Sequence, residues 1–246
     1  MLNGERFIRE TVESVLSQSG DFVLEYFIRD GGSTDGTLSI LEAYADRCMI
    51  TSEPDGSPQA AINAGIAEAA GDICCWLNAD DVFEPGALAA VARSFKQHPD
   101  RQWAYGRCRI IDREGKEIRR PVTWYKNLLG FAYSHHLLLC ENFINQPATF
   151  WRRELWEKTG GLSHELRAAF DYHLWLRMAT FSRAISVRRY LSRFRRHDTS
   201  ISEQHFETQF DEDYAVARQY GGFLHNAVHE LNRRKVRLIY SLLSRR

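Results

Sequence analysis

Residues 72–81 read Asp-Ile-Cys-Cys-Trp-Leu-Asn-Ala-Asp-Asp, an apolar run that ends in two adjacent acids. Such a continuous apolar run is typical of a strand that is buried on both faces. Asn78, Asp80 and Asp81 then fall in the loop at the carboxyl end of that strand. Because open α/β sheets bind their ligands at the carboxyl ends of strands, this stretch predicts both a sheet and a site.

The pattern of apolar strands and amphipathic helices continues on both sides of this stretch. It predicts an α/β protein in which loops at strand ends carry the chemistry. Strands are expected at 22–28, 49–51, 72–77, 103–112, 117–120 and 146–151, and helices at about 5–17, 58–70, 87–95 and 171–179.

The adjacent carboxylates Asp80 and Asp81 indicate a cation. No residue near them in the sequence neutralises them, and unpaired carboxylates at the end of a buried strand repel each other and lose solvation. Carboxylate oxygens suit Mg²⁺ or Mn²⁺, which commonly take further ligands from substrate phosphates. The alternative is that Asp80 or Asp81 caps, from a distance, the helix that begins at Pro85. Glu84 lies closer for that purpose, so the metal interpretation is favoured.

A second strand end carries Asp30, followed by Gly-Gly-Ser-Thr-Asp-Gly-Thr37. A carboxylate there can accept hydrogen bonds from a base N–H or from ribose hydroxyls, and the glycines let a planar ligand come close. Gly-Gly and Asp-Gly are also common in ordinary strand-to-helix turns, and the loop alone favours that interpretation. Asp171 likewise starts an apolar-faced helix, where the helix dipole favours any anion.

Taken together, these segments resemble glycosyltransferase family 2, which has the GT-A fold, from Asn3 to about Ser200. The resemblance rests on six segments in the same order at compatible spacing: residues 3–18, 30–37, 52–65, 76–81, 146–153 and 171–177. It implies an α/β, Rossmann-related fold with a mostly parallel sheet flanked by helices. It also implies a domain at 1–200, with a nucleotide-sugar half at 1–100 and an acceptor half at 101–200, followed by a helical extension at 201–246.

The resemblance also assigns roles to individual residues. Asn78 stands where the family carries the first aspartate of its metal motif, so a carbonyl or ribose contact is expected of it. For the two acceptor-side candidates, Gln146 and Arg152, the alternative is a structural role in a strand. The implied roles are nucleoside binding for Asp30, Asp55 and Asn78, metal binding for Asp80 and His197, general base for Asp171, and acceptor-side contacts for Gln146 and Arg152.

The activity that the resemblance implies is inverting, metal-dependent sugar transfer from a nucleotide-diphospho-sugar, with a UDP-sugar favoured. The acceptor would be a hydroxyl of a saccharide or lipid-linked molecule, in surface polysaccharide synthesis. Mg²⁺ or Mn²⁺ would neutralise the departing diphosphate. A carboxylate within about 3 Å would take the proton of the acceptor hydroxyl. One base on the face opposite the leaving group gives inversion at the anomeric carbon.

The start of the chain departs from the family, whose members begin with a strand and a turn before the first helix. Here Met1 and Leu2 lead straight into Asn3-Gly4. Either the true start lies upstream or the chain is a fragment, and without that strand the neighbouring strands are expected to expose edges. A non-catalytic nucleotide-sugar-binding remnant is therefore one alternative. A nucleotidyltransferase is another, but the basic, glycine-rich phosphate loop it predicts near the N-terminus is not visible.

Composition excludes several other classes. The 246 residues carry 32 basic and 32 acidic side chains, so no overall charge favours a nucleic-acid partner. Five cysteines without a CxxC pair fit neither a disulfide framework nor a zinc site. No apolar run reaches the roughly 18 residues of a membrane span. These features predict a reduced, cytoplasmic protein.

The C-terminal segment is basic. After Glu230 there is no acid, and Val236, Ile239, Tyr240 and Leu243 lie at helical spacing, which predicts a basic amphipathic helix. Such a helix could bind the anionic inner face of the cytoplasmic membrane, or it could dock on the domain with its basic residues in solvent. Its basic residues are Arg233, Arg234, Lys235, Arg237, Arg245 and Arg246.

Overall fold

The structure is a computed structural model that describes residues 1–198 and 206–243, with side chains described for 1–198 and 207–237. Of the predicted C-terminal face, the side chains of Ile239, Tyr240 and Leu243 lie outside the described residues, as do Arg245 and Arg246. The helices are α1 (Ile8–Leu16), α2 (Thr37–Glu42), α3 (Pro58–Glu68), α4 (Ala87–Gln97), α5 (Arg120–Leu129), α6 (His135–Cys140), α7 (Arg153–Thr159), α8 (Phe170–Phe181), α10 (Phe206–Tyr220) and α11 (Phe223–Leu243). The strands are β1 (Phe27–Asp30), β2 (Met49–Ser52), β3 (Ile73–Cys74), β4 (Val82–Phe83), β5 (Trp103–Ile111), β6 (Glu117–Ile118), β7 (Thr149–Arg152) and β8 (Ile185–Arg195).

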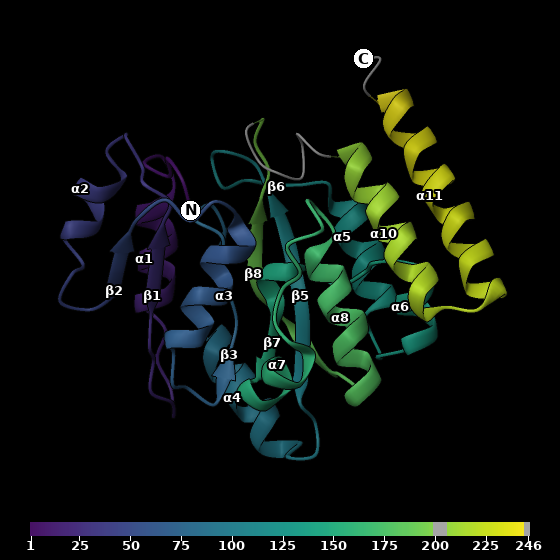
Figure 1. Cartoon of the computed structure of the whole chain (residues 1–246), viewed down its shortest axis with the longest axis horizontal. Coiled ribbons are helices and arrows are strands. Elements are labelled where there is room, and N and C mark those ends of the chain that lie inside the picture. Colours follow the sequence, from purple (N-terminus) through teal and green to yellow (C-terminus); the bar gives the residue numbers. More distant parts are fainter. Residues whose placement is uncertain (199–205, 244–246) are drawn as a thin grey trace.

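The strands form two sheets with helices on both sides (Figure 1). β1 and β2 make a parallel pair, and the larger sheet has the order β3-β7-β5-β8-β4, with β6 beside β5. Among the described strands, β1–β2 and β5–β8 are parallel and the other neighbouring pairs are antiparallel. The α/β class is as expected, but the larger sheet is mixed rather than mostly parallel. Short connections such as the β5–β6 hairpin can join antiparallel strands only.

Several strands differ from the sequence prediction. The strand expected at 72–77 is limited to β3, the one expected at 117–120 ends at Ile118 because Arg120 begins α5, and β8 was not among the expected strands. The strand expected at 22–28 begins at Phe27, because Val23 is 95% exposed and the carboxylate of Glu25 accepts the N–H groups of Ala70 and Gly71 instead of continuing a ladder. The strand expected at 146–151 begins with a 3₁₀ turn, η1 (Gln146–Ala148), because proline cannot donate to a ladder.

Met1 lies against the edge of β1 that faces away from β2. Its ammonium group donates to the carbonyl of Arg29 at 2.7 Å, and the N–H of Gly31 donates to the carbonyl of Met1 at 2.6 Å. This is the pattern of a parallel bridge. Among the described strands β1 pairs with β2 alone and β3 with β7 alone, and Met1 bonds to the end of the outer edge of β1.

Stacked indole rings join α8 to the larger sheet. The ring of Trp175 lies 5.7 Å from that of Trp76, 6.2 Å from that of Trp103 and 5.9 Å from that of Trp151, measured between centroids. All four side chains are buried. Because Trp76 directly precedes Leu77 and Asn78, this packing fixes the first turns of α8 relative to the loop after β3.

Candidate active site

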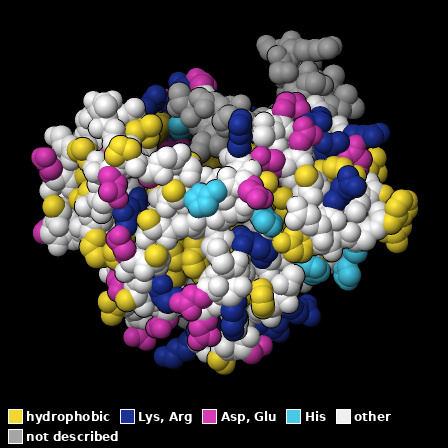
Figure 2. Space-filling view, in the orientation of Figure 1, with side chains coloured by type: hydrophobic (Ala, Val, Ile, Leu, Met, Phe, Trp, Pro, Cys, Tyr) yellow, Lys and Arg dark blue, Asp and Glu magenta, His cyan; other side chains and the backbone are white. Residues whose placement is uncertain are grey.

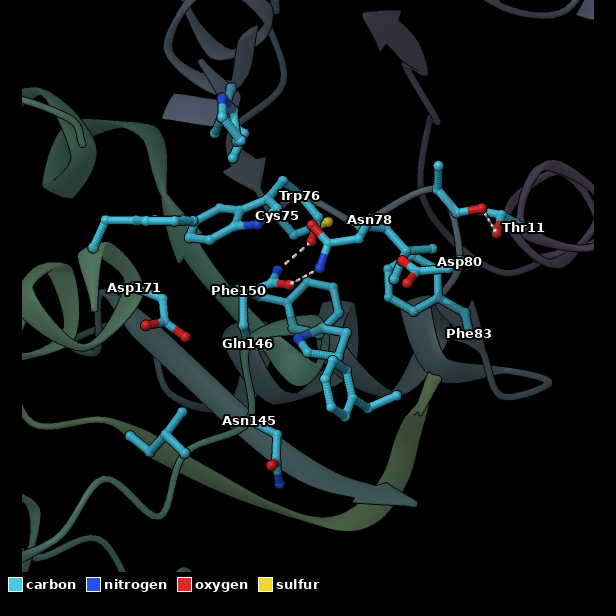
Figure 3. A pocket seen from close by; sticks show the side chains of 18 of the residues that line it. Thr11, Cys75, Trp76, Asn78, Asp80, Phe83, Asn145, Gln146, Phe150 and Asp171 are labelled. Carbon is cyan, nitrogen blue, oxygen red and sulfur yellow. Dashed lines mark hydrogen bonds between the residues drawn. The ribbon is translucent and has the colours of Figure 1, made fainter. Parts of the chain in front are cut away.

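A cleft runs from the carboxyl ends of β1 and β3 to the first turn of α8 (Figure 3). Its cavity volume of about 2490 Å³ exceeds the roughly 300–1,000 Å³ of ordinary ligand pockets. The excess arises because the cleft is continuous with an apolar slot between β1 and β3, lined by Tyr26, Ile28 and Ile73 among others. All of the predicted site residues except Asp30 line this cleft.

Asp30 ends β1 with its carboxylate turned into the protein, where it is 2% exposed. Its Oδ2 accepts the N–H groups of Gly32 at 3.1 Å and Ser33 at 2.8 Å and the hydroxyl of Ser52 at 2.7 Å. Its Oδ1 accepts the hydroxyl of Ser33. Burial opposes charge on Asp30, but these hydrogen bonds outweigh it and lower the pKa of Asp30 below its usual value. Asp30 therefore shapes the loop, and its contact with a nucleoside stays a prediction.

Asp55 faces the same loop from the turn after β2. A Cβ placed at Gly31 would lie 3.2 Å from Asp55 Oδ2 and 3.1 Å from the carbonyl of Met1, which is too close for an unstrained side chain. Gly32 has φ +87°, a left-handed conformation that favours glycine. The two glycines thus allow Asp55 and the loop to approach each other at the wall of the cleft.

The two acids after β3 have different surroundings. Asp81 is fully buried; the N–H of Arg195 donates to its Oδ1 at 2.8 Å and the amide of Asn78 donates to its Oδ2 at 3.2 Å. Burial and then the charge of Asp80 raise the pKa of Asp81 well above its usual value, although these hydrogen bonds act in the opposite direction. The interpretation of Asp80 and Asp81 as carboxylates without partners is therefore wrong. Arg195 and His197, which contact Asp81 and Asp80, come from a segment distant in the sequence, whereas Asn78 lies three residues before Asp81.

Asp80 faces His197, the other predicted metal ligand. Nε2 of His197 lies 2.8 Å from Oδ2 of Asp80, and both side chains are mostly buried at the cleft. Within residues 1–198 and 206–243, no group of three or more His, Cys, Asp or Glu side chains is arranged to hold a metal. One carboxylate and one imidazole nevertheless suit a cation such as Mn²⁺ that takes further ligands from substrate phosphates.

Arg195, at the end of β8, is a site residue that the sequence analysis missed. Its guanidinium is 1% exposed, forms an ion pair with Glu10 and donates to the carbonyls of Asp80 at 2.8 Å and Asp112 at 3.1 Å. The loop that carries Asp80 is thus held by a buried cation. The available signal was an arginine two residues before His197; the strand β8 that carries it was not among the expected strands.

Asn78 and Gln146 meet between Asp80 and Asp171 (Figure 3). The amide of Asn78 donates to Oε1 of Gln146 at 3.2 Å, and the amide of Gln146 donates to the carbonyl of Trp76 at 2.7 Å. A residue predicted for the nucleotide side therefore contacts one predicted for the acceptor side. The two halves of the site meet at this pair.

Asp171 lies in the first turn of α8 with one described hydrogen bond, in which the N–H of Tyr172 donates to Oδ1 at 2.6 Å. Burial raises the pKa of Asp171 to about 6, although the N–H of Tyr172 and the charge of Lys126 act to lower it. A carboxyl group with this pKa is ionised at neutral pH and is still a better base than an exposed aspartate.

The N–H groups directly before α8 are held by another helix. The carboxylate of Glu212, on α10, accepts the N–H groups of Arg167, Ala168 and Ala169 at 2.8 to 3.2 Å. Within the first turn it is Asp171 that accepts the N–H of Tyr172, so a structural role at the helix start remains the alternative for Asp171.

Arg152 lies apart from this group of polar residues. Its Nε donates to the carbonyl of Arg101 at 3.0 Å, and its guanidinium stacks over the ring of Phe95 at 5.1 Å. These contacts favour the structural alternative for Arg152, at the end of β7.

The chain was compared with known proteins. A family model described as glycosyl transferase family 2 matches residues 1–160. A PGL/p-HBAD biosynthesis glycosyltransferase of Mycobacterium bovis is 31% identical over 196 residues, covering 77% of this chain and 70% of that protein. The chondroitin synthase of Pasteurella multocida is 25% identical over 220 residues, covering 88% of this chain. The chain spans only 22% of that synthase.

Two solved structures share the fold. The mannosyltransferase PcManGT of Pyrobaculum calidifontis, in complex with GDP-Man and Mn²⁺, has a TM-score of 0.69 and 20% identity, covering 93% of this chain and 67% of its own. TarS 1-349 of S. aureus, in complex with UDP-GlcNAc, has a TM-score of 0.67 and 17% identity, covering 95% of this chain and 70% of its own. The expected GT-A fold and the expected enzyme class are confirmed by these matches together with the family model. The chain belongs to glycosyltransferase family 2.

Proposed function

We propose that the chain transfers a sugar from a nucleotide-diphospho-sugar to a hydroxyl of a saccharide or lipid-linked acceptor, with inversion at the anomeric carbon. The observation that carries the proposal is the position of Asp171 at the cleft, together with its raised pKa. This carboxyl group, with a pKa near 6, opens onto the same cleft as Asp80 and is separated from it by Asn78 and Gln146. The base and the diphosphate would then lie on opposite sides of the reacting carbon.

The donor would lie against the loop after β1, with Asp30 and Asp55 at the nucleoside and Asn78 at the ribose. Residues 1–100 would bind this part of the donor and residues 101–200 most of the acceptor. A UDP-sugar is favoured by the family resemblance and by the UDP-GlcNAc complex of TarS. The GDP-Man complex of PcManGT keeps guanosine among the bases to be tested.

Asp80 and His197 would hold the divalent cation. Their side chains face each other at the cleft, and PcManGT was solved with Mn²⁺. Mg²⁺ or Mn²⁺ bound there would neutralise the diphosphate as the glycosidic bond breaks. Asp81 and Arg195 would hold the loop of Asp80 in place, and Asp171 would remove the proton of the acceptor hydroxyl.

Two relatives suggest the biological setting. By its name, chondroitin synthase makes a polysaccharide. By its name, the glycosyltransferase of Mycobacterium bovis acts in the biosynthesis of PGL and p-HBAD. We therefore keep surface polysaccharide synthesis as the proposed role.

The direct experiment is to incubate the chain with UDP-, GDP- and dTDP-sugars and Mn²⁺, with and without methyl glycosides as acceptors. Release of nucleoside diphosphate that rises on addition of an acceptor, together with a product of inverted anomeric configuration by NMR, supports the proposal. Absence of both donor binding and donor turnover in every nucleotide series would contradict it.

A peripheral contact with the inner face of the membrane is a second proposal. Leu224, Val228 and Leu231 are exposed on α11, and exposed Lys235 follows them at helical spacing. Figure 2 shows hydrophobic and basic side chains near each other over the part of the molecule where α11 lies. By contrast, Arg233 forms ion pairs with Asp211 and with Glu230 and so contributes less free charge than the sequence suggests. No helix within the described residues is long and apolar enough to cross a bilayer.

Flotation with anionic vesicles tests this second proposal. The chain should float at low salt, and Leu224→Gln with Leu231→Gln should reduce the floated fraction, because apolar burial and basic charge act together. Equal behaviour of the two proteins would contradict a membrane contact through α11.

A further inference from the structure

A second buried carboxyl group lines the cleft on its acceptor side. Asp213, on α10, is 6% exposed, and its Oδ1 has no hydrogen-bond partner among the described residues. The side chain of Asn142 lies beside the carboxyl group of Asp213, and Oδ1 of Asn142 is itself buried without a described partner. Both side chains line the cleft that holds Asp171. Two unpartnered oxygens at one cleft can be satisfied by a hydroxyl group of a bound ligand.

The groups around Asp213 come from several elements. Asp171 and Tyr172 of α8 and Lys126 of α5 interact with it through charge, and Glu212 is its neighbour on α10. Arg233 of α11 pairs with Asp211, one turn away from this cluster. Burial and then the charge of Asp171 raise the pKa of Asp213 well above its usual value, whereas Lys126 and Asn142 act to lower it.

We propose that the carboxyl group of Asp213 and the neighbouring side chain of Asn142 together bind a second hydroxyl of the acceptor, next to the hydroxyl that Asp171 deprotonates. This inference rests on the proposed function and names the class of acceptor more narrowly. The unpartnered oxygens of Asp213 and Asn142 can accept a hydrogen bond and the amide N–H can donate one, which matches a hydroxyl group that both donates and accepts. The acceptor end is therefore a saccharide or polyol with neighbouring hydroxyls, rather than a simple lipid alcohol.

Two variants of similar volume separate binding from packing. Asp213→Asn keeps a hydrogen-bonding side chain without a charge, and we expect the acceptor KM of methyl glycosides to stay within about threefold of the wild-type value. Asp213→Leu fills the space without a hydrogen-bonding group, and the acceptor KM should rise tenfold or more, while donor affinity and acceptor-free donor hydrolysis are unchanged. Asp211→Asn, on the exposed side of the same helix, is the matched control. An unchanged acceptor KM in Asp213→Leu would overturn the proposal.

Carboxyl ¹³C NMR of the aspartates gives a readout that needs neither donor nor acceptor. The pKa of Asp213 should lie well above that of an exposed aspartate, and it should fall in Asp171→Asn because the neighbouring charge is gone. An Asp213 that titrates like an exposed aspartate would overturn its placement beside Asp171 even in an active enzyme. Conversely, failure of the wild-type chain to bind or turn over any nucleotide sugar would reject the proposed function, and the titration would still decide the state of Asp213.

Discussion

The loop after β1 and the first turn of α8 each bury a carboxyl group, but their surroundings are opposite. Asp30 accepts hydrogen bonds from Gly32, Ser33 and Ser52, and its pKa is lowered. Asp171 accepts one described hydrogen bond, and burial raises its pKa to about 6. A carboxylate that the chain satisfies organises the protein. One that the chain leaves largely unsatisfied at a cleft is available to a substrate.

The largest expected effect is at the unsatisfied group. Asp171→Asn keeps the size of the side chain and the contact with Tyr172 but cannot accept a proton. We expect kcat for transfer to fall by about 10²–10⁴-fold, the usual contribution of a general base, with donor affinity retained. Steady-state kinetics and donor calorimetry measure the two effects, with the exposed Asp100→Asn as control. Near-normal transfer by Asp171→Asn would show that Asp171 is not the general base.

Asp80 and Asp81 sharpen the comparison within one loop. Asp80→Asn should lower transfer by about 100-fold, the size usual for removing one electrostatic contact to developing charge. It should also raise the Mn²⁺ concentration needed for half-maximal activity. Asp81→Asn keeps the size of the buried side chain and an oxygen that can accept the N–H of Arg195, and it should change the Mn²⁺ requirement little. Full activity of the wild-type chain in excess EDTA would contradict a role for Asp80 in metal binding.

The pH dependence should be smaller but diagnostic. Since the base must be ionised, kcat should fall about tenfold for each pH unit below about 6.

The effects of pH on the free energy of unfolding should have opposite signs at Asp171 and at Asp30. The raised pKa of Asp171 means that its contribution to the free energy of unfolding decreases as pH rises from about 4 towards 6. The lowered pKa of Asp30 means that its contribution is lost as pH falls below about 4. Urea titrations of Asp171→Asn and Asp30→Asn across this range should show opposite changes in slope.

The smallest effect is expected at the satisfied group. Asp30→Ala should lower the free energy of unfolding by about 1.5–3 kcal/mol, the range for hydrogen bonds to a charged group. It should weaken donor binding about tenfold while leaving kcat at saturating donor nearly unchanged, because a nucleoside contact contributes uniform binding. If calorimetry shows unchanged donor affinity in a folded variant, Asp30 has a structural role alone.

Local patterns in the sequence predicted the elements and the loops of the site. The strand before Asn78, the helix of Asp171 and the glycine loop after Asp30 are each specified by a few neighbouring residues, and each is present, although the strand is shorter than predicted. Partners that depend on topology were not predictable in this way. Arg195 reaches Asp81, and Glu212 binds the N–H groups before α8, only because strands and helices distant in the sequence pack together. The same reason explains the mixed strand directions.

The separate β1–β2 sheet has a consequence for how the molecule opens. A two-stranded sheet is marginal by itself, and this one is held by a small core that includes Ile8, Ile28 and Leu41. Its amide hydrogens should therefore exchange with solvent through local opening, at a lower free energy than those of β5 and β8. A donor that bridges the Asp30 loop and Asp80 would join this small unit to the larger sheet. Its binding would be recorded as slowed exchange in β1 and β2, far from the acceptor side.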